Sequence, residues 1–271
     1  MSISTFVTFI SSPLLQQNMA KISTGVKFLD IFLDGGYDAE VVTTVYGPSG
    51  SGKTNLCLLA AVHAANAGKK VLFVDTEGGI AVERIKQLSK NYEKILSRMM
   101  FFNPTTFTEQ DQFISKLKNI MNDKVGLIVV DSISMLYRVE LGKSRNNETE
   151  KNEGVKNQEK KNQEKKYERG NSNGGVQDAN AALGRQLAAL VGLARKKHIP
   201  ILITNQVYAD FNNPENVKMV GGDLLKYGSK CLLELQKFAN ARGVILRKHR
   251  SLPEGKTLKF RIVQEGIEEV R

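Results

Sequence analysis

Short apolar runs alternate with longer segments of helical spacing through the first half of the chain. The runs are rich in β-branched residues and predict strands over Val41–Tyr46, Lys70–Asp75, Met99–Phe102 and Val125–Asp131. Between them, apolar residues recur every three or four positions and predict helices over Asn55–Ala67, Ile80–Leu96 and Thr108–Met121, the last with a threonine cap. This alternation predicts an α/β fold whose mostly parallel sheet carries helices on both faces.

The pattern breaks between Gly142 and Gly175. This segment contains nine basic and six acidic residues, a net charge of +3, and almost no apolar residue. Such a composition cannot bury enough surface to offset the entropy of ordering the chain, so we expect a disordered insertion or a frayed polar helix. The sequence predicts one domain over residues 19–271 with this insertion at about 142–175, and a loosely ordered extension over residues 1–18.

Regular patterns resume after the insertion. A helix is predicted over Val176–Lys197 and a strand over Ile199–Thr204, followed by a loop over Tyr208–Gly222 that is rich in Asn and Gly. Three antiparallel strands are predicted to end the chain, over Lys230–Phe238, Gly243–Lys248 and Thr257–Val263. The fold class is therefore an α/β core with a C-terminal antiparallel extension.

Composition and charge narrow the function only slightly. The formal net charge of +11 favours a polyanionic partner, although basic surfaces are also common without one. No apolar run reaches 18 residues, and no Lys or Arg precedes the short apolar stretch near the N-terminus, so we expect a cytoplasmic protein without a membrane partner. Cys57 and Cys231 are far apart and are expected to be reduced core thiols.

The most specific motif is a complete phosphate-binding loop between the first strand and the first helix. Its eight residues match the pattern G-x-x-x-x-G-K-[ST] and are Gly47, Pro48, Ser49, Gly50, Ser51, Gly52, Lys53 and Thr54. The glycines let successive N–H groups point at phosphate oxygens. Lys53 can reach the β- and γ-phosphates, and the Thr54 hydroxyl can bind Mg²⁺. The sequence therefore predicts nucleotide binding.

Three polar residues at strand ends are candidates for the rest of the site. Asp131 ends the strand Val125–Asp131 and can organise Mg²⁺, although it could simply cap the residues that follow. Glu77 follows the strand Lys70–Asp75 and can polarise an attacking water, or it could be a loop acid. Gln206 follows Ile199–Thr204, where an amide can sense the γ-phosphate or serve as a turn residue.

Several short motifs together resemble the RecA-type recombinases over about residues 20–263, outside the insertion. They are Ser23-Thr24-Gly25, Leu29-Asp30, Gly35-Gly36, the phosphate loop, Asp75-Thr76-Glu77-Gly78, Glu83-Arg84, the strand ending at Asp131, and Ile203-Thr204-Asn205-Gln206-Val207. Within that superfamily the chain resembles the short archaeal RadB family. Two departures favour this family over the strand-exchange recombinase RadA. The sequence before the core leaves no room for the helix-hairpin-helix domain expected of RadA, and it shows no Phe-x-x-Ala oligomerisation motif; the nearest candidate, Phe9-Ile10-Ser11-Ser12, lacks the Ala.

The resemblance implies both a site and a biological role. It implies a RecA-type core that binds ATP and Mg²⁺, with Glu77 activating water, Asp131 on the metal and Arg84 packed against the adenine. It also implies binding to single-stranded or branched DNA, weak ATPase activity and no strand exchange. The implied partners are a RadA-type recombinase and a Holliday-junction nuclease. The alternative is a KaiC-like regulatory ATPase that acts on protein partners without DNA.

A basic triplet, Lys248-His249-Arg250, occurs where RadB and KaiC-like ATPases carry one near the nucleotide of an adjacent subunit. Because side chains alternate along a strand, Lys248 and Arg250 are expected on one exposed face of an edge hairpin, with His249 pointing the opposite way. They could complete a neighbouring ATP site or bind DNA phosphate. They could also be solvated charges that discourage edge-strand aggregation.

Overall fold

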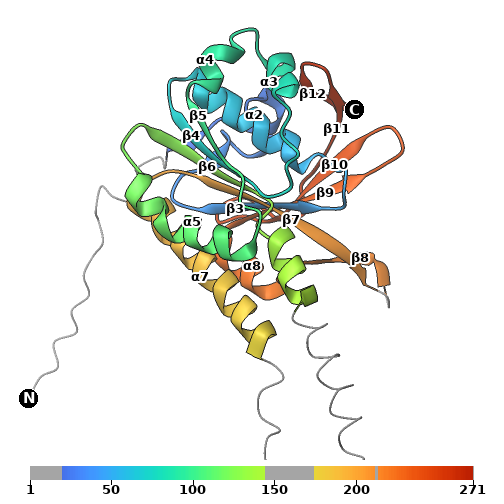
Figure 1. Cartoon of the computed structure of the whole chain (residues 1–271). Coiled ribbons are helices and arrows are strands. Elements are labelled where there is room, and N and C mark those ends of the chain that lie inside the picture. Colours follow the sequence, from blue (N-terminus) through green and yellow to red (C-terminus); the bar gives the residue numbers. More distant parts are fainter. Residues whose placement is uncertain (1–19, 144–173, 211–212, 271) are drawn as a thin grey trace, which may run out of the picture.

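A computed structural model describes residues 20–143, 174–210 and 213–270 (Figure 1). Its main feature is a 10-stranded sheet in the order β12-β11-β10-β9-β3-β7-β6-β4-β5, with β8 paired to β7. A separate two-stranded sheet joins β1 (Lys21–Ile22) to β2 (Tyr37–Asp38). The predicted extension over 1–18 and most of the predicted insertion lie outside the described residues.

The parallel part of the sheet follows the sequence pattern closely. Its strands are β3 (Val42–Gly47), β4 (Lys70–Asp75), β5 (Met99–Phe102), β6 (Val125–Asp131), β7 (Ile201–Asp210) and β9 (Cys231–Lys237). Strands β3, β4 and β6 are buried almost throughout, because helices cover both faces of the sheet. Their carboxyl ends meet along one edge of the sheet, which is where ligands bind in open α/β folds.

Helices cover the sheet in two layers, each with its own apolar core. Helices α2 (Lys53–Asn66), α3 (Val82–Leu88) and α4 (Tyr92–Leu96) pack on one face together with α1 (Lys27–Phe32). Helices α5 (Phe107–Ile120), α7 (Gly174–Lys197) and α8 (Gly222–Gly228) pack on the other (Figure 1). Residues 135–143 are also helical. The predicted α/β architecture is confirmed.

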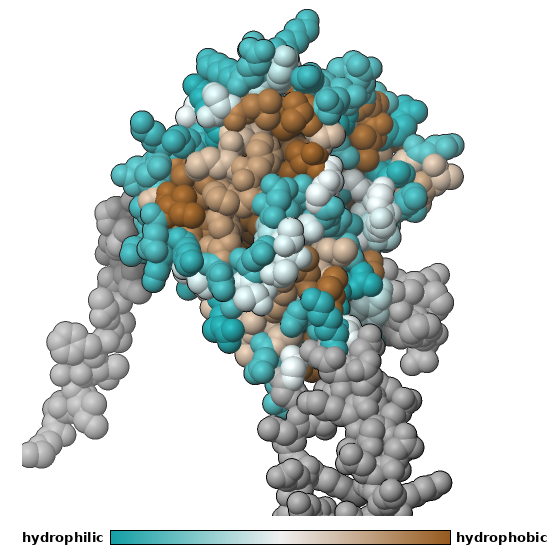
Figure 2. Space-filling model, viewed as in Figure 1, coloured by the Kyte–Doolittle hydropathy of each residue, from teal (hydrophilic) through white to brown (hydrophobic). Residues whose placement is uncertain are grey.

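Edge strand β5 leaves apolar surface at one end of the sheet. Three of its four residues, Met100, Phe101 and Phe102, are only half-buried. Figure 2 shows apolar surface gathered on this side of the molecule, between the layer of α2 and α4 and the layer of α5.

Among the described helices, none is long and apolar enough to cross a membrane.

The bounds of two predicted helices differ in the structure. The predicted helix Ile80–Leu96 is two helices, because the backbone is extended at Ser89, whose hydroxyl accepts the N–H of Asn91 at 3.2 Å. Helix α5 is capped by Thr106, whose hydroxyl accepts the N–H of Glu109 at 3.1 Å, and starts one residue before the expected Thr108.

The second half contains more strands than predicted. The segment 208–222, predicted as a loop, continues β7 to Asp210, returns as β8 (Asn213–Met219) and enters α8. The three predicted C-terminal strands are confirmed as β9, β10 (Arg242–Lys248) and β11 (Thr257–Val263), and a fourth, β12 (Gly266–Val270), pairs with β11. Strand β12 is therefore the edge, and β10 lies between β9 and β11.

Candidate nucleotide site

The phosphate loop lies at the carboxyl end of β3, with its apex exposed at Ser49 and Gly50. Its first glycine is fixed by a close contact, since a Cβ atom at Gly47 would lie 2.4 Å from the carbonyl oxygen of Leu235 on β9. Gly52, at φ 102°, takes the left-handed conformation that starts α2. The strand-loop-helix geometry predicted for residues 47–54 is present.

The interior of the loop is suited to phosphate. The Lys53 side chain is buried, and its ammonium donates to the carbonyl oxygens of Gly47 and Pro48, each at 3.0 Å. Burial lowers the pKa of Lys53, while the nearby carboxylates of Glu77 and Asp131 oppose that shift. The first N–H groups of α2 have no side-chain cap, and the buried Ser51 hydroxyl has no hydrogen-bond partner. Phosphate oxygens would satisfy these donors.

The two predicted metal ligands lie together beside Lys53. Asp131 is buried at the end of β6, where its carboxylate accepts hydrogen bonds from the hydroxyls of Thr204 and Thr54. Burial raises the pKa of Asp131, and those two hydrogen bonds partly offset the increase. Within the described residues, no cluster of three His, Cys, Asp or Glu side chains could hold a metal by itself. A hydroxyl beside a carboxylate suits Mg²⁺, which takes its other ligands from water and phosphate.

Glu77 is presented by a loop that Asp75 shapes. The Asp75 carboxylate accepts backbone N–H groups from Glu77, Gly78, Gly79 and Ile80 at 2.8–3.4 Å. The loop that results directs the Glu77 side chain toward Gln206, which lies within β7 and not after it, because this strand continues past Thr204 to Asp210. Two sequence-predicted candidates are thereby brought into contact, because the Gln206 amide donates to Oε1 of Glu77 at 2.7 Å.

A third residue, Arg138, continues the contacts from Glu77 to Gln206 and was not predicted from the sequence. Arg138, from the helical segment 135–143, donates through Nη1 to Oε1 of Gln206 at 2.5 Å. The Gln206 amide is thus held on both sides, by a carboxylate and by a guanidinium. No motif or spacing marks Arg138 in the sequence, because its partner lies far along the chain on β7.

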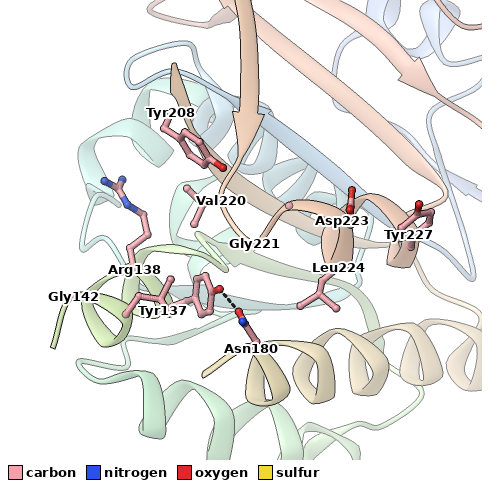
Figure 3. A pocket seen from close by; sticks show the side chains of 12 residues that line it. Tyr137, Arg138, Gly142, Asn180, Tyr208, Val220, Gly221, Asp223, Leu224 and Tyr227 are labelled. Atoms are coloured by element: carbon pink, nitrogen blue, oxygen red, sulfur yellow. Dashed lines mark hydrogen bonds between the residues drawn. The ribbon is translucent and has the colours of Figure 1, made fainter. Parts of the chain in front are cut away.

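Arg138 also lines a hollow of about 980 Å³ outside the nucleotide site (Figure 3). Arg138 and Tyr208 lie at one end of it, and Leu224 and Tyr227 of α8 lie at the other. A second hollow of about 830 Å³ shares Tyr208 and Tyr227 with it. The hydrogen bonds that join Glu77 to Gln206 and Gln206 to Arg138 therefore extend to a tyrosine-lined hollow, which the sequence did not predict.

Arg84 lies beside the first turn of α2. Its Nε donates to Oδ1 of Asn55 at 2.9 Å, and its terminal nitrogens donate to the carbonyl oxygens of Val263, Gln264 and Gly266 at 2.9–3.2 Å. Burial of the guanidinium lowers the pKa of Arg84. The side chain thus joins the β11–β12 turn to the helix that follows the phosphate loop, and the predicted contact with adenine stays a prediction.

The basic triplet is placed differently from the prediction. Strand β10 is not an edge strand, and Lys248 donates to the carbonyl oxygens of Lys226 and Ser229 at 2.8 and 2.9 Å. His249 and Arg250 do not point apart: both reach the buried carboxylate of Asp38, at 3.4 and 2.8 Å. The reason is that β10 ends at Lys248, so the alternation of a strand no longer applies after it.

The triplet is also distant from the phosphate loop of its own chain. Arg250 contacts Asp38, which precedes β3, whereas the phosphate loop follows β3. The triplet and the phosphate loop therefore lie at opposite ends of β3. In this chain the structure brings together the loop, Thr54, Asp131, Glu77 and Gln206, and it leaves Lys248 and Arg250 elsewhere.

The chain resembles known proteins over nearly its whole length. It matches the protein family described as Rad51 over residues 15–161 and 167–270. It is 38% identical over 241 residues to the DNA repair and recombination protein RadB of Methanococcus maripaludis (strain C7), covering 89% of this chain and 97% of the relative. It is 38% identical to RadB of Methanocaldococcus jannaschii over 235 residues, covering 86% and 95% of the two chains.

A solved structure gives the same result for the fold. A crystal structure described as that of the RadB recombinase superposes with a TM-score of 0.70 at 36% sequence identity. The match covers 92% of this chain and 100% of the other.

Proposed function

The chain belongs to the Rad51 family, among its RadB paralogues, and from this premise we propose that it binds ATP with Mg²⁺ and acts in DNA repair and recombination. The observation that carries the proposal is the meeting of the phosphate loop with Thr54, Asp131, Glu77 and Gln206 in one place. A phosphate loop alone would support nucleotide binding only, whereas an acid and an amide facing it also support hydrolysis.

In the proposed site, each residue has a defined task. The N–H groups of the loop and the Lys53 ammonium would bind phosphate oxygens, and Thr54 and Asp131 would hold Mg²⁺, which would supply positive charge beside the phosphates. The Glu77 carboxylate accepts a proton from the attacking water. Gln206 donates to Oε1 of the same carboxylate at 2.7 Å, and Oε2 can still accept from water. An amide donor on the carboxylate weakens it as a base, which supports a slow ATPase.

DNA binding and the partners of the chain belong to the same proposal. Relatives named as DNA repair and recombination proteins and the net charge of +11 support single-stranded or branched DNA as the polyanion. We place the chain as an accessory of a RadA-type recombinase, without strand exchange of its own, that also influences a Holliday-junction nuclease. A KaiC-like regulatory ATPase remains the second reading, and the test below separates the two.

The test combines nucleotide binding with DNA binding. We expect the wild-type chain to bind ATP and Lys53→Ala to lose nearly all affinity, because the loop loses the cation that faces the β- and γ-phosphates. DNA affinity measured against salt, with and without ATP, should fall steeply, with a slope equivalent to several released counterions. Unchanged ATP affinity in Lys53→Ala would refute the site. A flat salt dependence would favour the regulatory ATPase.

A further inference from the structure

The turn between β9 and β10 touches the phosphate loop from outside. Strand β9 ends at Lys237 and β10 begins at Arg242. Nε of Arg242 donates to the carbonyl oxygen of Gly50 at 2.9 Å, and its Nη1 donates to the carbonyl oxygen of Ala241 at 3.0 Å. Lys237 is close as well, because its Nζ would lie 3.7 Å from a Cβ atom at Gly50. Two cations from one hairpin therefore converge on the apex of the loop.

Two cations opposite each other repel unless a negative charge lies nearby. Lys237 and Arg242 are directly opposite each other in the β9–β10 ladder, and like charges in that position destabilise a sheet. The ion pairs found among the described residues include neither of them. A polyphosphate in the loop beside them would supply the missing negative charge.

The bond to Gly50 also orients one peptide of the loop. In a trans peptide the carbonyl and the following N–H point in opposite directions, so fixing the Gly50 carbonyl toward Arg242 turns the Ser51 N–H away from it. That N–H donates to the carbonyl oxygen of Pro48 at a long distance of 3.3 Å. It is therefore readily available to a phosphate oxygen.

We infer that Arg242 is a positioning residue of the phosphate loop, and that Lys237 adds a second positive charge beside the bound polyphosphate. Arg242 acts through the Gly50–Ser51 peptide and does not itself contact the nucleotide. The inference rests on the proposed function, since it has meaning only if the loop binds a nucleotide. It assigns part of the site to a hairpin almost 200 residues after the loop motif, where no phosphate-binding pattern occurs.

The test compares nucleotide affinity in variants of the full chain. We expect Arg242→Ala to bind ATP and ADP about tenfold more weakly, which corresponds to ~1.4 kcal/mol. AMP affinity should be unchanged, because a phosphate loop grips the β- and γ-phosphates. Arg242→Lys keeps the charge and one donor and should recover part of the loss. Lys237→Ala should weaken ATP more than ADP, because it removes charge and leaves the loop conformation intact.

A matched control separates positioning from general stability. Arg98 donates to the carbonyl oxygen of Ala65 at 2.8 Å, near the other end of α2. Arg98→Ala removes a bond of the same kind and should leave ATP affinity unchanged. The Tm of the nucleotide-free Arg242→Ala protein should not fall below that of the wild type, because relief of the repulsion from Lys237 offsets the lost hydrogen bonds. Its smaller Tm increase on adding ATP should report the lost affinity.

Each result decides between the inference and the proposed function. Wild-type ATP affinity in Arg242→Ala would overturn the inference, and if Lys53→Ala still lost ATP, the proposed function would stand. Equal losses in Arg242→Ala and Arg98→Ala, or an equal loss of AMP, would also overturn it. If Arg242→Ala failed to fold, Arg242→Lys and Lys237→Ala would decide, and wild-type affinity in both would overturn the inference. No ATP binding by the wild type would overturn both ideas.

Discussion

Asp131 is a buried carboxylate whose hydrogen-bond donors are two hydroxyl groups, from Thr204 and Thr54. Burial raises its pKa above the ordinary value for an aspartate. For a group with a raised pKa in the folded state, the contribution to stability is present below the unfolded pKa and is lost as pH rises through the folded pKa. In the absence of a cation, ionised Asp131 therefore lowers the stability of the folded chain at neutral pH.

We predict that Asp131→Asn raises the Tm of the nucleotide-free protein at neutral pH by a few degrees, since ~1 kcal/mol shifts a large domain by about 2–4 °C. The gain should shrink as pH is lowered toward the ordinary aspartate pKa of about 3.9. The same variant should bind ATP with little dependence on Mg²⁺. Thermal unfolding across pH and ATP titrations with and without Mg²⁺ test both parts. A lower Tm at neutral pH would contradict the argument.

Arg138 gives a second prediction about a single residue. Removing its guanidinium in Arg138→Ala leaves Oε1 of Gln206 without its charged donor, so the amide is no longer held against Glu77. We expect the rate of ATP hydrolysis at saturating ATP to change about fivefold, equivalent to ~1 kcal/mol, while ATP affinity stays the same. The direction reports whether the held amide assists Glu77 or restrains it; we expect a faster reaction.

The control for Arg138→Ala is Arg185→Ala. Arg185 is an exposed arginine on α7 that pairs with Asp111 at 3.4 Å, far from the nucleotide site. It should leave the rate and the affinity unchanged. A shift in ATP affinity with an unchanged rate in Arg138→Ala would mean that the contact supports the loop and does not act through Glu77.

Among the elements, helix α5 illustrates how a helix start depends on contacts that sequence patterns describe only approximately. The sequence pattern predicts a helix that starts with a threonine cap at Thr108. In the structure Thr106 caps the helix, while Oε2 of Glu109 accepts from both the N–H and the hydroxyl of Thr105 at 2.8 and 3.0 Å. Glu109 thus bonds to the cap residue through its N–H and to the residue before the cap through its carboxylate.

We predict that Thr106→Ala lowers the Tm by about 2–4 °C, because loss of a cap costs ~1 kcal/mol. Thr108→Ala removes a similar exposed hydroxyl within the first turn and should leave the Tm unchanged or slightly higher, since alanine favours helix. Thermal unfolding of both variants measures the difference. A larger loss in Thr108→Ala would return the cap to the position expected from sequence.

The strands whose bounds were predicted most accurately from the sequence are buried on both faces of the sheet. Strands β4 and β6 were placed at their observed bounds because strands covered on both faces read as unbroken apolar runs. The pairing of β7 with β8 is local, but this hairpin was missed because its Asn- and Pro-containing sequence has the composition of a loop and no regular apolar alternation. The loop motif and its acids were found because they follow local patterns, whereas Arg138 and Arg242, whose partners are distant in sequence, were not.

For the whole molecule, the central question is whether the basic triplet serves another subunit. Strand β3 separates Lys248 and Arg250 from the phosphate loop of their own chain. If they act on ATP, they must do so from a neighbouring chain. We predict that Lys248→Ala combined with Arg250→Ala lowers ATPase activity while ATP affinity is kept.

Mixing variants tests this arrangement. Lys53→Ala chains carry an intact triplet, and the double variant carries an intact phosphate loop, so a mixture should recover some turnover at shared sites. ATPase rates of the mixture and of each variant alone give the result. No recovery, together with a weaker salt dependence of DNA binding in the double variant, would assign the triplet to a DNA surface.

The position of β3 has a consequence for how the chain acquires its site during synthesis. Strand β3 carries the phosphate loop near the start of the domain, yet both strands that flank it, β7 and β9, belong to the last third of the sequence. At ribosomal rates of 5–20 residues per second, roughly 10–40 seconds separate synthesis of residue 47 from that of residue 237. During this interval β3, which carries the motif, has neither of the strands that flank it in the finished sheet. We expect nascent chains that lack the C-terminal strands not to bind nucleotide, and their exposed strand edges should make them prone to aggregate.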